Sequence, residues 1–304
     1  FSLDAAEQLW PGHATGSDEL LDLIFHLVDK SLLQVEERAG EARYRMLETI
    51  RAYGREQLLV AAETSATLAR YISWCENLVE QAAPQLWGRD QAHWLRQLDA
   101  EYDHLRAMLD WCRTHDPEAG LRLAGHLWWY WRVRGSFIEG RRWFADLLAL
   151  VDRRAVVHAR AYLGAGILAA FQGDRRAARP LLNESLARYQ ELGNQRGIGW
   201  ASANLGLLAL TEDDWDAAEA FLDSGIAGLS AADDQAGLGW AMDVYGDLAW
   251  VRGEAELAGE RYSASRAIRR ELDDERGVGW ASLKLGNVAR VRGDLARSAE
   301  LLGE

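Results

Sequence analysis

Gly197-Ile198-Gly199-Trp200 recurs as Gly237-Leu238-Gly239-Trp240 and as Gly277-Val278-Gly279-Trp280, each copy 40 residues after the one before. A fixed interval of this size is the sequence signature of a repeat protein, in which one supersecondary unit stacks on the next. One interval upstream, Arg160 stands in place of the tryptophan. The period therefore predicts a solenoid over residues 158–304.

Each unit has the pattern of two helices. Leu205, Leu208 and Ala209 form an apolar stripe at helical spacing, and a second stripe follows the turn at Asp213-Asp214. Two sets of residues also keep their places in every copy: Gly166, Gly206, Gly246 and Gly286 align, as do Leu182, Leu222, Tyr262 and Leu302. The predicted N-caps of the following units are Asn194, Asp234 and Asp274.

These positions resemble the tetratricopeptide repeat. The residues that carry the resemblance in one unit are Leu205-Gly206, Ala209, Ala218, Leu222 and Gly225. The usual unit of that family is shorter, so we expect the extra residues to lie in the loop between units, from Ala231 to Gly237. A less regular first unit is predicted at residues 121–150, which gives about five units in a right-handed superhelix.

The first 60 residues have the pattern of a small α+β winged helix. Helices are expected at residues 2–10, 18–28 and 48–60, with a β-hairpin of residues 32–36 and 42–47 around a turn at 38–41. The domain holds 6 basic and 11 acidic residues, and its groove-facing helix would carry Asp18, Glu19 and Asp22. Carboxylates repel phosphates, so we expect no direct binding of nucleic acid.

Two helices are expected to connect the winged helix to the repeats. They cover residues 66–83 and 90–114, with a turn from Pro84 to Gly88. Apolar residues recur at helical spacing through both segments. Asp116-Pro117 is expected to end the second of them.

Several segments resemble the region that follows the nucleotide-binding core of bacterial STAND ATPases, multidomain signalling proteins that include LuxR- and AfsR-like transcriptional regulators. The resemblance is carried by Leu27–Leu33, Arg43–Tyr53, Glu101–Ala107 and Glu139–Trp143. It implies that the winged helix is a regulatory lid over a nucleotide on an upstream ATPase domain. In that family a histidine that touches phosphate often occupies the place of Leu47, whose side chain cannot make this contact.

The composition limits the partners and the compartment. The formal net charge is −13, from 34 basic and 47 acidic residues, which opposes general attraction to nucleic acid. The two cysteines, Cys75 and Cys112, lie far apart, and there is no signal peptide or long apolar run. We therefore expect a cytoplasmic protein without a membrane span. The chain begins without methionine and ends within a helical pattern, so we expect a fragment of a longer protein.

The sequence has none of the common catalytic motifs. There is no Gly-x-x-x-x-Gly-Lys-Ser/Thr phosphate loop, no His-Glu-x-x-His and no Cys-x-x-Cys. Glu101 and His104 have the spacing of one metal-ligand pair, but no second pair accompanies them. We expect no enzyme activity, metal or cofactor in this chain; ATP or ADP is expected only on the upstream domain that the resemblance implies.

The candidate binding surface is the concave face, which the first helix of each unit lines in a tetratricopeptide array. The side chains predicted to face it are Trp129, Arg132, Trp200, Leu207, Trp240, Asp243, Asp247, Trp250, Trp280, Asn287 and Arg290. Aromatic rings with a few polar groups suit a peptide side chain, a sugar or a heterocycle. The alternative is that the repeated tryptophans are core residues that pack on the glycines of a neighbouring unit.

These features predict a mainly α-helical protein with a winged helix at residues 1–60, a helical connector at 61–117 and repeats at 118–304. The predicted function is that of the sensor and regulatory part of a STAND-type regulator. An inducer, or a protein or peptide partner, would bind the concave face. The winged helix would relay that binding to the upstream nucleotide-binding domain. The alternatives are an interaction scaffold without a switch and an enzyme with an unrecognised site.

Overall fold

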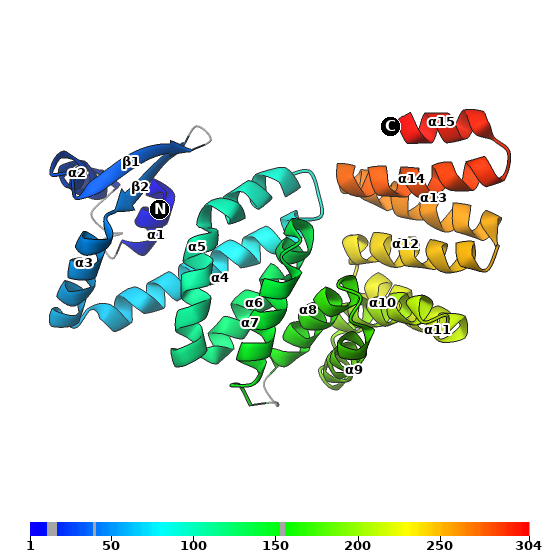
Figure 1. Cartoon of the computed structure of the whole chain (residues 1–304), viewed down its shortest axis with the longest axis horizontal. Coiled ribbons are helices and arrows are strands. Elements are labelled where there is room, and N and C mark those ends of the chain that lie inside the picture. The colour runs from blue at the N-terminus through cyan, green and yellow to red at the C-terminus, as the bar shows by residue number, and fades with distance from the viewer. Residues whose placement is uncertain (11–16, 39–40, 153–155, 304) are drawn as a thin grey trace. The chain divides into compact units, whose positions relative to one another are not determined.

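The computed structural model describes residues 1–10, 17–38, 41–152 and 156–303, which are mainly helical (Figure 1). Their packing divides them into two compact units. The first unit contains Phe1–Leu78 and Asp103–Met108, and the second contains Val79–Tyr102 and Leu109–Glu304. In the part of the chain that the structure describes, no helix is long and apolar enough to cross a membrane.

The first unit begins with the winged helix. Its elements are α1 (Leu3–Leu9), α2 (Ser17–Asp29), β1 (Leu33–Arg38), β2 (Glu41–Met46) and α3 (Glu48–Val60). The strands are antiparallel, with Leu33 opposite Met46 and Val35 opposite Tyr44. Leu20 and Ile24 of α2 pack on Leu33 and Tyr44, which gives the domain its small core. The predicted helices and hairpin are confirmed, but Arg38 and Glu41 of the predicted turn belong to the strands. Ala39 and Gly40 lie outside the described residues.

Two long helices follow, α4 (Thr64–Gln85) and α5 (Gln91–His115). The predicted turn at Pro84 to Gly88 is wrong at its start, because α4 continues through Pro84. A proline lacks only its own N–H, and in the last turn of a helix this costs one hydrogen bond. The side chain of Asp116 then accepts from the Ala119 N–H at 3.1 Å, so it caps the next helix.

The repeats pair α6 (Pro117–Arg134) with α7 (Phe137–Leu148), and α8 (His158–Phe171) with α9 (Arg175–Glu191). The later pairs are α10 (Gln195–Thr211) with α11 (Trp215–Ala231), α12 (Gln235–Val251) with α13 (Ala255–Glu271), and α14 (Glu275–Val291) with α15 (Leu295–Gly303). The prediction that the extra residues lie in a loop from Ala231 to Gly237 is wrong. Each helix from α9 to α14 has 17 residues and three residues separate neighbours, so the extra residues lengthen the helices.

Three residues suffice for each turn because the backbone reverses through one left-handed residue. That residue is Gly193, Asp233 or Asp273 between units, with φ of 62°, 52° and 53°. The next residue then caps the following helix. The side chains of Asn194, Asp234 and Asp274 accept from backbone N–H groups three residues later at 2.9, 2.8 and 3.0 Å, which confirms the predicted N-caps.

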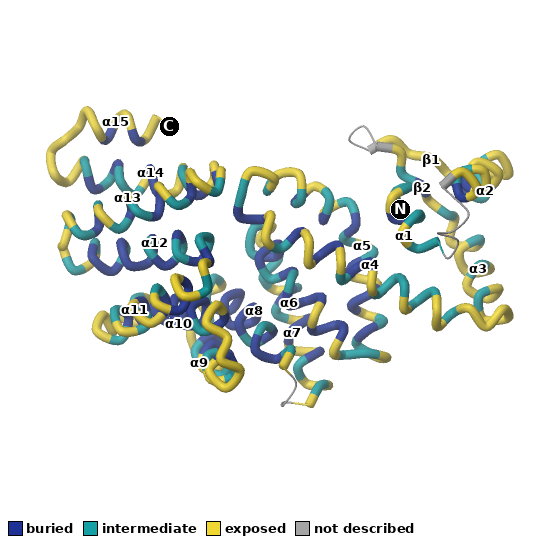
Figure 2. Tube along the Cα trace, turned by 180° about the vertical axis from the view of Figure 1, so that it is seen from behind, coloured by how far each residue is buried: buried dark blue, intermediate teal, exposed yellow. Residues whose placement is uncertain are grey.

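The aligned glycines allow the two helices of each unit to approach closely. A Cβ atom at Gly206 would lie 2.8 Å from Cγ of Leu222, and one at Gly166 would lie 2.8 Å from Cγ of Leu182. The other pairs of this kind are Gly246 with Tyr262 and Gly286 with Leu302. The first helix of a unit is also covered by its neighbours, so α12 is buried along most of its length between α10, α11 and α13 (Figure 2).

Candidate functional site

Four tryptophan rings meet where the turn between α4 and α5 reaches the first helices of the repeats. Trp87 lies in the turn, Trp128 and Trp129 on α6, and Trp200 on α10. The rings of Trp87 and Trp129 are stacked with centroids 3.5 Å apart, and the ring of Trp200 lies 5.2 Å from that of Trp87. Trp128 is half-buried and the other three are buried.

These rings line a cavity of about 290 Å³, which we call the tryptophan pocket. Its polar lining includes His126 of α6, Arg160 of α8 and Arg196 of α10. A concave site with aromatic walls and a few convergent polar groups is the usual form of a ligand pocket, and this volume matches a small ligand.

The two arginines of the tryptophan pocket differ in their partners. Nε of Arg196 lies 2.5 Å from Oδ2 of Asp234, which also accepts from the indole of Trp200 at 2.9 Å. Burial by itself would raise the pKa of Asp234, but the hydrogen bonds from Arg196 and from the Gly237 N–H hold it below its usual value. Among the described residues, Arg160 forms no ion pair with a carboxylate.

Arg160 instead contacts a histidine. Its Nη1 lies 2.6 Å from Nε2 of His126, and because a guanidinium has only donors, this ring nitrogen accepts. Burial, followed by the charges of Arg160 and Arg196, lowers the pKa of His126 to about 4, so the ring is neutral at pH 7. The stem of Arg160 fits because Gly125 has no side chain: a Cβ there would lie 3.0 Å from Cδ of Arg160.

The turn between α4 and α5 (residues 86–90) is held in place by contacts with several helices of the repeats. The carbonyl oxygen of Leu86 accepts from the indole of Trp129 at 3.1 Å. Arg89 pairs with Asp273 at 2.6 Å, in the turn between α13 and α14 (Figure 1). Part of the predicted concave surface is therefore covered by the chain itself. Sequence reasoning missed this because nothing local in residues 86–90 indicates where the turn packs.

A second cluster, which we call the Arg132 cage, adjoins the tryptophan pocket. The guanidinium carbon of Arg132 lies 4.3 Å from the ring centre of Trp129, 4.1 Å from Phe171 and 5.2 Å from Trp240. Nε of Arg132 and Nε1 of Trp240 are buried donors without a hydrogen-bond partner. Burial, with the nearby charges of Arg276 and Arg269, lowers the pKa of Arg132 to about 10, so it stays charged at pH 7. The structure thus brings together three of the predicted residues, and adds Phe171.

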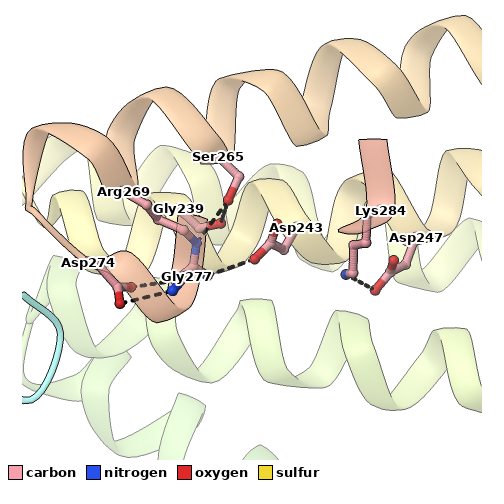
Figure 3. Close-up of polar contacts among 8 residues, drawn as sticks. All are labelled: Gly239, Asp243, Asp247, Ser265, Arg269, Asp274, Gly277 and Lys284. Atoms are coloured by element: carbon pink, nitrogen blue, oxygen red, sulfur yellow. Dashed lines mark hydrogen bonds and ion pairs between the residues drawn. The ribbon is translucent and has the colours of Figure 1, made fainter. Parts of the chain in front are cut away.

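Asp243, predicted for the same surface, lies in a buried network (Figure 3). Arg269 donates to Asp243 at 2.7 Å, to Asp274 at 2.8 Å and to Ser265 at 3.1 Å. The side chain of Asp243 is 1% exposed, and burial raises its pKa against the opposing charge of Arg269. Its Oδ2 atom thus joins α12 to α13, while its Oδ1 atom is buried without a hydrogen-bond partner among the described residues.

Asp247 is also paired within the protein. It accepts from Nζ of Lys284 at 2.8 Å (Figure 3). It also accepts from the hydroxyl of Tyr262 at 2.7 Å. Lys284 in turn lies 5.5 Å from the ring centre of Trp280, which is 54% exposed. This end of the surface therefore presents an open indole beside a lysine.

The three repeated tryptophans differ in environment. Trp200 is buried against the next unit, since a Cβ at Gly237 would lie 3.2 Å from its Nε1; this is the core arrangement given as the alternative. Trp240 is half-buried against Phe171, with ring centres 5.9 Å apart. Trp280 is exposed. The same sequence position therefore has a different environment in each of the three units.

The remaining predicted residues divide between packing and solvent. Trp250 packs against a core cluster around Tyr262, and Leu207 against one around Val244. Asn287 is half-buried, and Arg290 is exposed. Across the described ranges, no group of three or more His, Cys, Asp or Glu side chains is placed to hold a metal ion.

Comparison with known families identifies the N-terminal domain. The winged helix-turn-helix domain family matches residues 2–59. Two curated relatives are "Putative HTH-type transcriptional regulator Rv0890c" of Mycobacterium tuberculosis and "Putative HTH-type transcriptional regulator Mb0914c" of Mycobacterium bovis. Each is 35% identical over 141 residues, which covers 44% of this chain but only 16% of the relative.

Solved structures confirm the fold of the helical region. NprR in complex with its cognate peptide NprX is similar at a TM-score of 0.57 with 12% identity, over 93% of this chain and 75% of that one. The APC/C hetero-tetramer Cut9-Hcn1 gives 0.54 with 16% identity, over 81% and 45%. BtubC from P. vanneervenii gives 0.51 with 16% identity, over 78% and 88%. The chain therefore has a winged helix-turn-helix domain followed by a tetratricopeptide-like superhelix, and it is similar to HTH-type regulators.

Proposed function

We propose that this chain is the sensing and regulatory part of an HTH-type transcriptional regulator, and that its repeats bind a peptide or a short protein segment. The observation that carries the proposal is the group of aromatic rings and arginines formed by the tryptophan pocket and the Arg132 cage, which share Trp129. Tryptophan, tyrosine and arginine dominate the binding energy of protein interfaces when they are partly desolvated. Recognition rather than catalysis is the role proposed for the chain.

A peptide suits this surface better than a compact ligand. The tryptophan pocket and the Arg132 cage share Trp129, and the cage contains Trp240 of α12. The structural likeness to NprR, which was solved with its cognate peptide, is consistent with this class of ligand.

The turn between α4 and α5 offers a route for relaying the signal. A ligand in the tryptophan pocket would touch Trp87, which follows the last residues of α4. The helix α4 continues without a break to Thr64, four residues after α3 ends. A ligand that binds more tightly to one position of this turn would increase the population of that position. In the STAND arrangement that the sequence resembles, the winged helix would pass this change to an ATP- or ADP-binding domain upstream.

The proposal is tested with a peptide library and the whole chain, using tryptophan fluorescence and calorimetry. The variants Trp280→Ala and Arg132→Gln should weaken the selected peptides about tenfold or more, because both remove contacts on the binding face. The control is Trp215→Ala on α11, a 40% exposed tryptophan in the second helix of a unit. Unchanged affinity in both test variants would contradict a concave binding site. Hydrogen exchange of residues 79–91 that does not change with ligand would favour the scaffold without a switch.

A second candidate function is DNA binding by the winged helix, which the family match favours. On α2, Asp18, Glu19 and Asp22 are exposed, and so is Phe25 at 57%. We expect this face to contact protein rather than phosphate, because three carboxylates oppose groove entry. The test is titration with mixed duplex DNA at several salt concentrations. Binding that weakens steeply with salt would establish contact with DNA and would contradict this expectation.

A further inference from the structure

An arginine without a carboxylate partner stands in the wall of the tryptophan pocket. Arg160 is half-buried and takes the place that tryptophan occupies in the later units. Its Nη1 donates to His126, which is neutral because its pKa lies at about 4. A guanidinium has five N–H donors in a planar fork, so the group retains donors for a ligand. A partly desolvated charge of this kind favours an anionic partner.

We infer that the tryptophan pocket binds the free C-terminal carboxylate of a peptide, with Arg160 holding the carboxylate and the indole rings holding the last side chain. This inference rests on the proposed function and names the end of the peptide that the chain recognises. An arginine fork matches a carboxylate in size and geometry, since both groups are planar and two parallel hydrogen bonds join them.

The charges around the tryptophan pocket favour a ligand group with a single negative charge. Arg196 is already neutralised by Asp234 at 2.5 Å, so Arg160 supplies one net positive charge. The acidic side chain of the pocket lining, Glu80 on α4, is exposed, and solvent screens its charge. A phosphate group carries up to two charges and is bound by clusters of cations or of backbone N–H groups. Such a cluster is not what Arg160 and the neutral His126 form.

The size of the tryptophan pocket limits the ligand to one residue and its carboxylate. A cavity of about 290 Å³ is at the lower end of the range for small-molecule sites. Trp128, Trp129 and Trp200 supply flat apolar walls, which suit an aromatic or branched last side chain. The rest of the peptide would continue along the repeats toward the Arg132 cage, which shares Trp129 with the pocket.

The test compares a peptide library in two forms, with a free C-terminal carboxylate and with a C-terminal amide, on the whole chain. The free acids should bind about tenfold to a hundredfold more tightly, which is the range expected for a charged hydrogen-bonded pair. Arg160→Gln should remove this preference. The matched control is Arg175→Gln, an exposed arginine of the same repeat unit, which should leave the preference unchanged. Phenyl phosphate and phenylacetate are titrated in parallel as small anions with one aromatic ring.

Equal binding of acid and amide, an acid preference that survives Arg160→Gln, or tighter binding of phenyl phosphate than of phenylacetate would overturn the inference. If acids and amides bind equally and Trp280→Ala weakens both, the proposed peptide function stands and only the carboxylate site fails. If neither library binds, both proposals fail. The thermal midpoint of Arg160→Gln is measured first, to check that the variant folds. Arg160→Lys is a second variant, which keeps the charge but loses the planar fork.

Discussion

The indole Nε1 of Trp129 donates a 3.1 Å hydrogen bond to the carbonyl oxygen of Leu86, which lies 43 residues earlier in the chain. This contact ties the turn between α4 and α5 to the first helix of the repeats. The ring of Trp129 also stacks on Trp87 and lies beneath the guanidinium of Arg132. One side chain therefore joins the turn, the tryptophan pocket and the Arg132 cage.

Trp129→Phe should loosen this turn without removing the aromatic ring. The carbonyl of Leu86 would keep its second donor, Gln91 Nε2 at 2.6 Å, but would lose the indole. We expect a loss of about 1 kcal/mol in the free energy of unfolding and faster hydrogen exchange in residues 86–91. Urea denaturation and exchange mass spectrometry measure the two effects. Trp215→Phe is the control, and exchange rates that match the wild type would contradict the role given to this bond.

Gly206→Ala should destabilise the repeats, and Gly239→Ala should not. A Cβ at Gly206 would lie 2.8 Å from Cγ of Leu222 and 3.2 Å from the Ala218 carbonyl, so the two helices of the unit would have to separate. We expect a cost of about 1–3 kcal/mol in the free energy of unfolding. At Gly239 the nearest atom would lie at 3.5 Å, an ordinary contact, and alanine should gain about 0.5–1 kcal/mol in helix stability. If both variants shift the urea midpoint in the same direction by a similar amount, this predicted difference is wrong.

Arg269→Met should be far more damaging than its surface counterpart. It leaves the carboxylates of Asp243 and Asp274 buried without their cation, and removing one partner of a buried pair costs about 3–5 kcal/mol. Arg292→Met removes an exposed pair with Glu256 and should cost under about 1 kcal/mol. Thermal and urea unfolding compare them. Similar midpoints for both variants would mean that water reaches the Arg269 network.

His126 should make the folded state less stable in mild acid. Its pKa is lowered from 6.5 to about 4, so below pH 6.5 the unfolded chain takes up a proton that the folded chain does not. The stability associated with neutral His126 is therefore complete above pH 6.5 and is lost as the pH falls toward 4. His126→Gln should flatten the curve of unfolding free energy in this window. A variant curve parallel to the wild type between pH 4 and 6.5 would show that the ring is protonated in the folded state.

Much of the repeat architecture could be predicted because it depends on short-range relations. Asp234 caps the helix that begins one residue later, and Gly206 meets Leu222 within the same helical pair. The error in the loop from Ala231 to Gly237 arose from assigning length to loops rather than to helices. A helix can add a turn at each end without changing its apolar stripe, so the pattern alone does not place the ends.

The candidate site could be predicted only in part. Trp129, Arg132 and Trp240 were expected on one face and do meet there, with Phe171 added. Trp87 was missed, because no periodic pattern includes it. Arg160 carried a usable signal, since it breaks the series of tryptophans at a place where the later units keep one.

The sequence by itself determined the period, the helix caps and the aligned glycine positions, because each of these depends on residues within one 40-residue unit. The tertiary structure alone decided which tryptophans are accessible and which charges are already paired. Arg89 meets Asp273 across 184 positions, and Asp243 meets Arg269 between two helices. Such contacts depend on how successive units stack, and small rotations between units add up along the array. Trp200 is buried against Gly237 of the next unit, whereas Trp280, at the same position of the last described unit, is exposed.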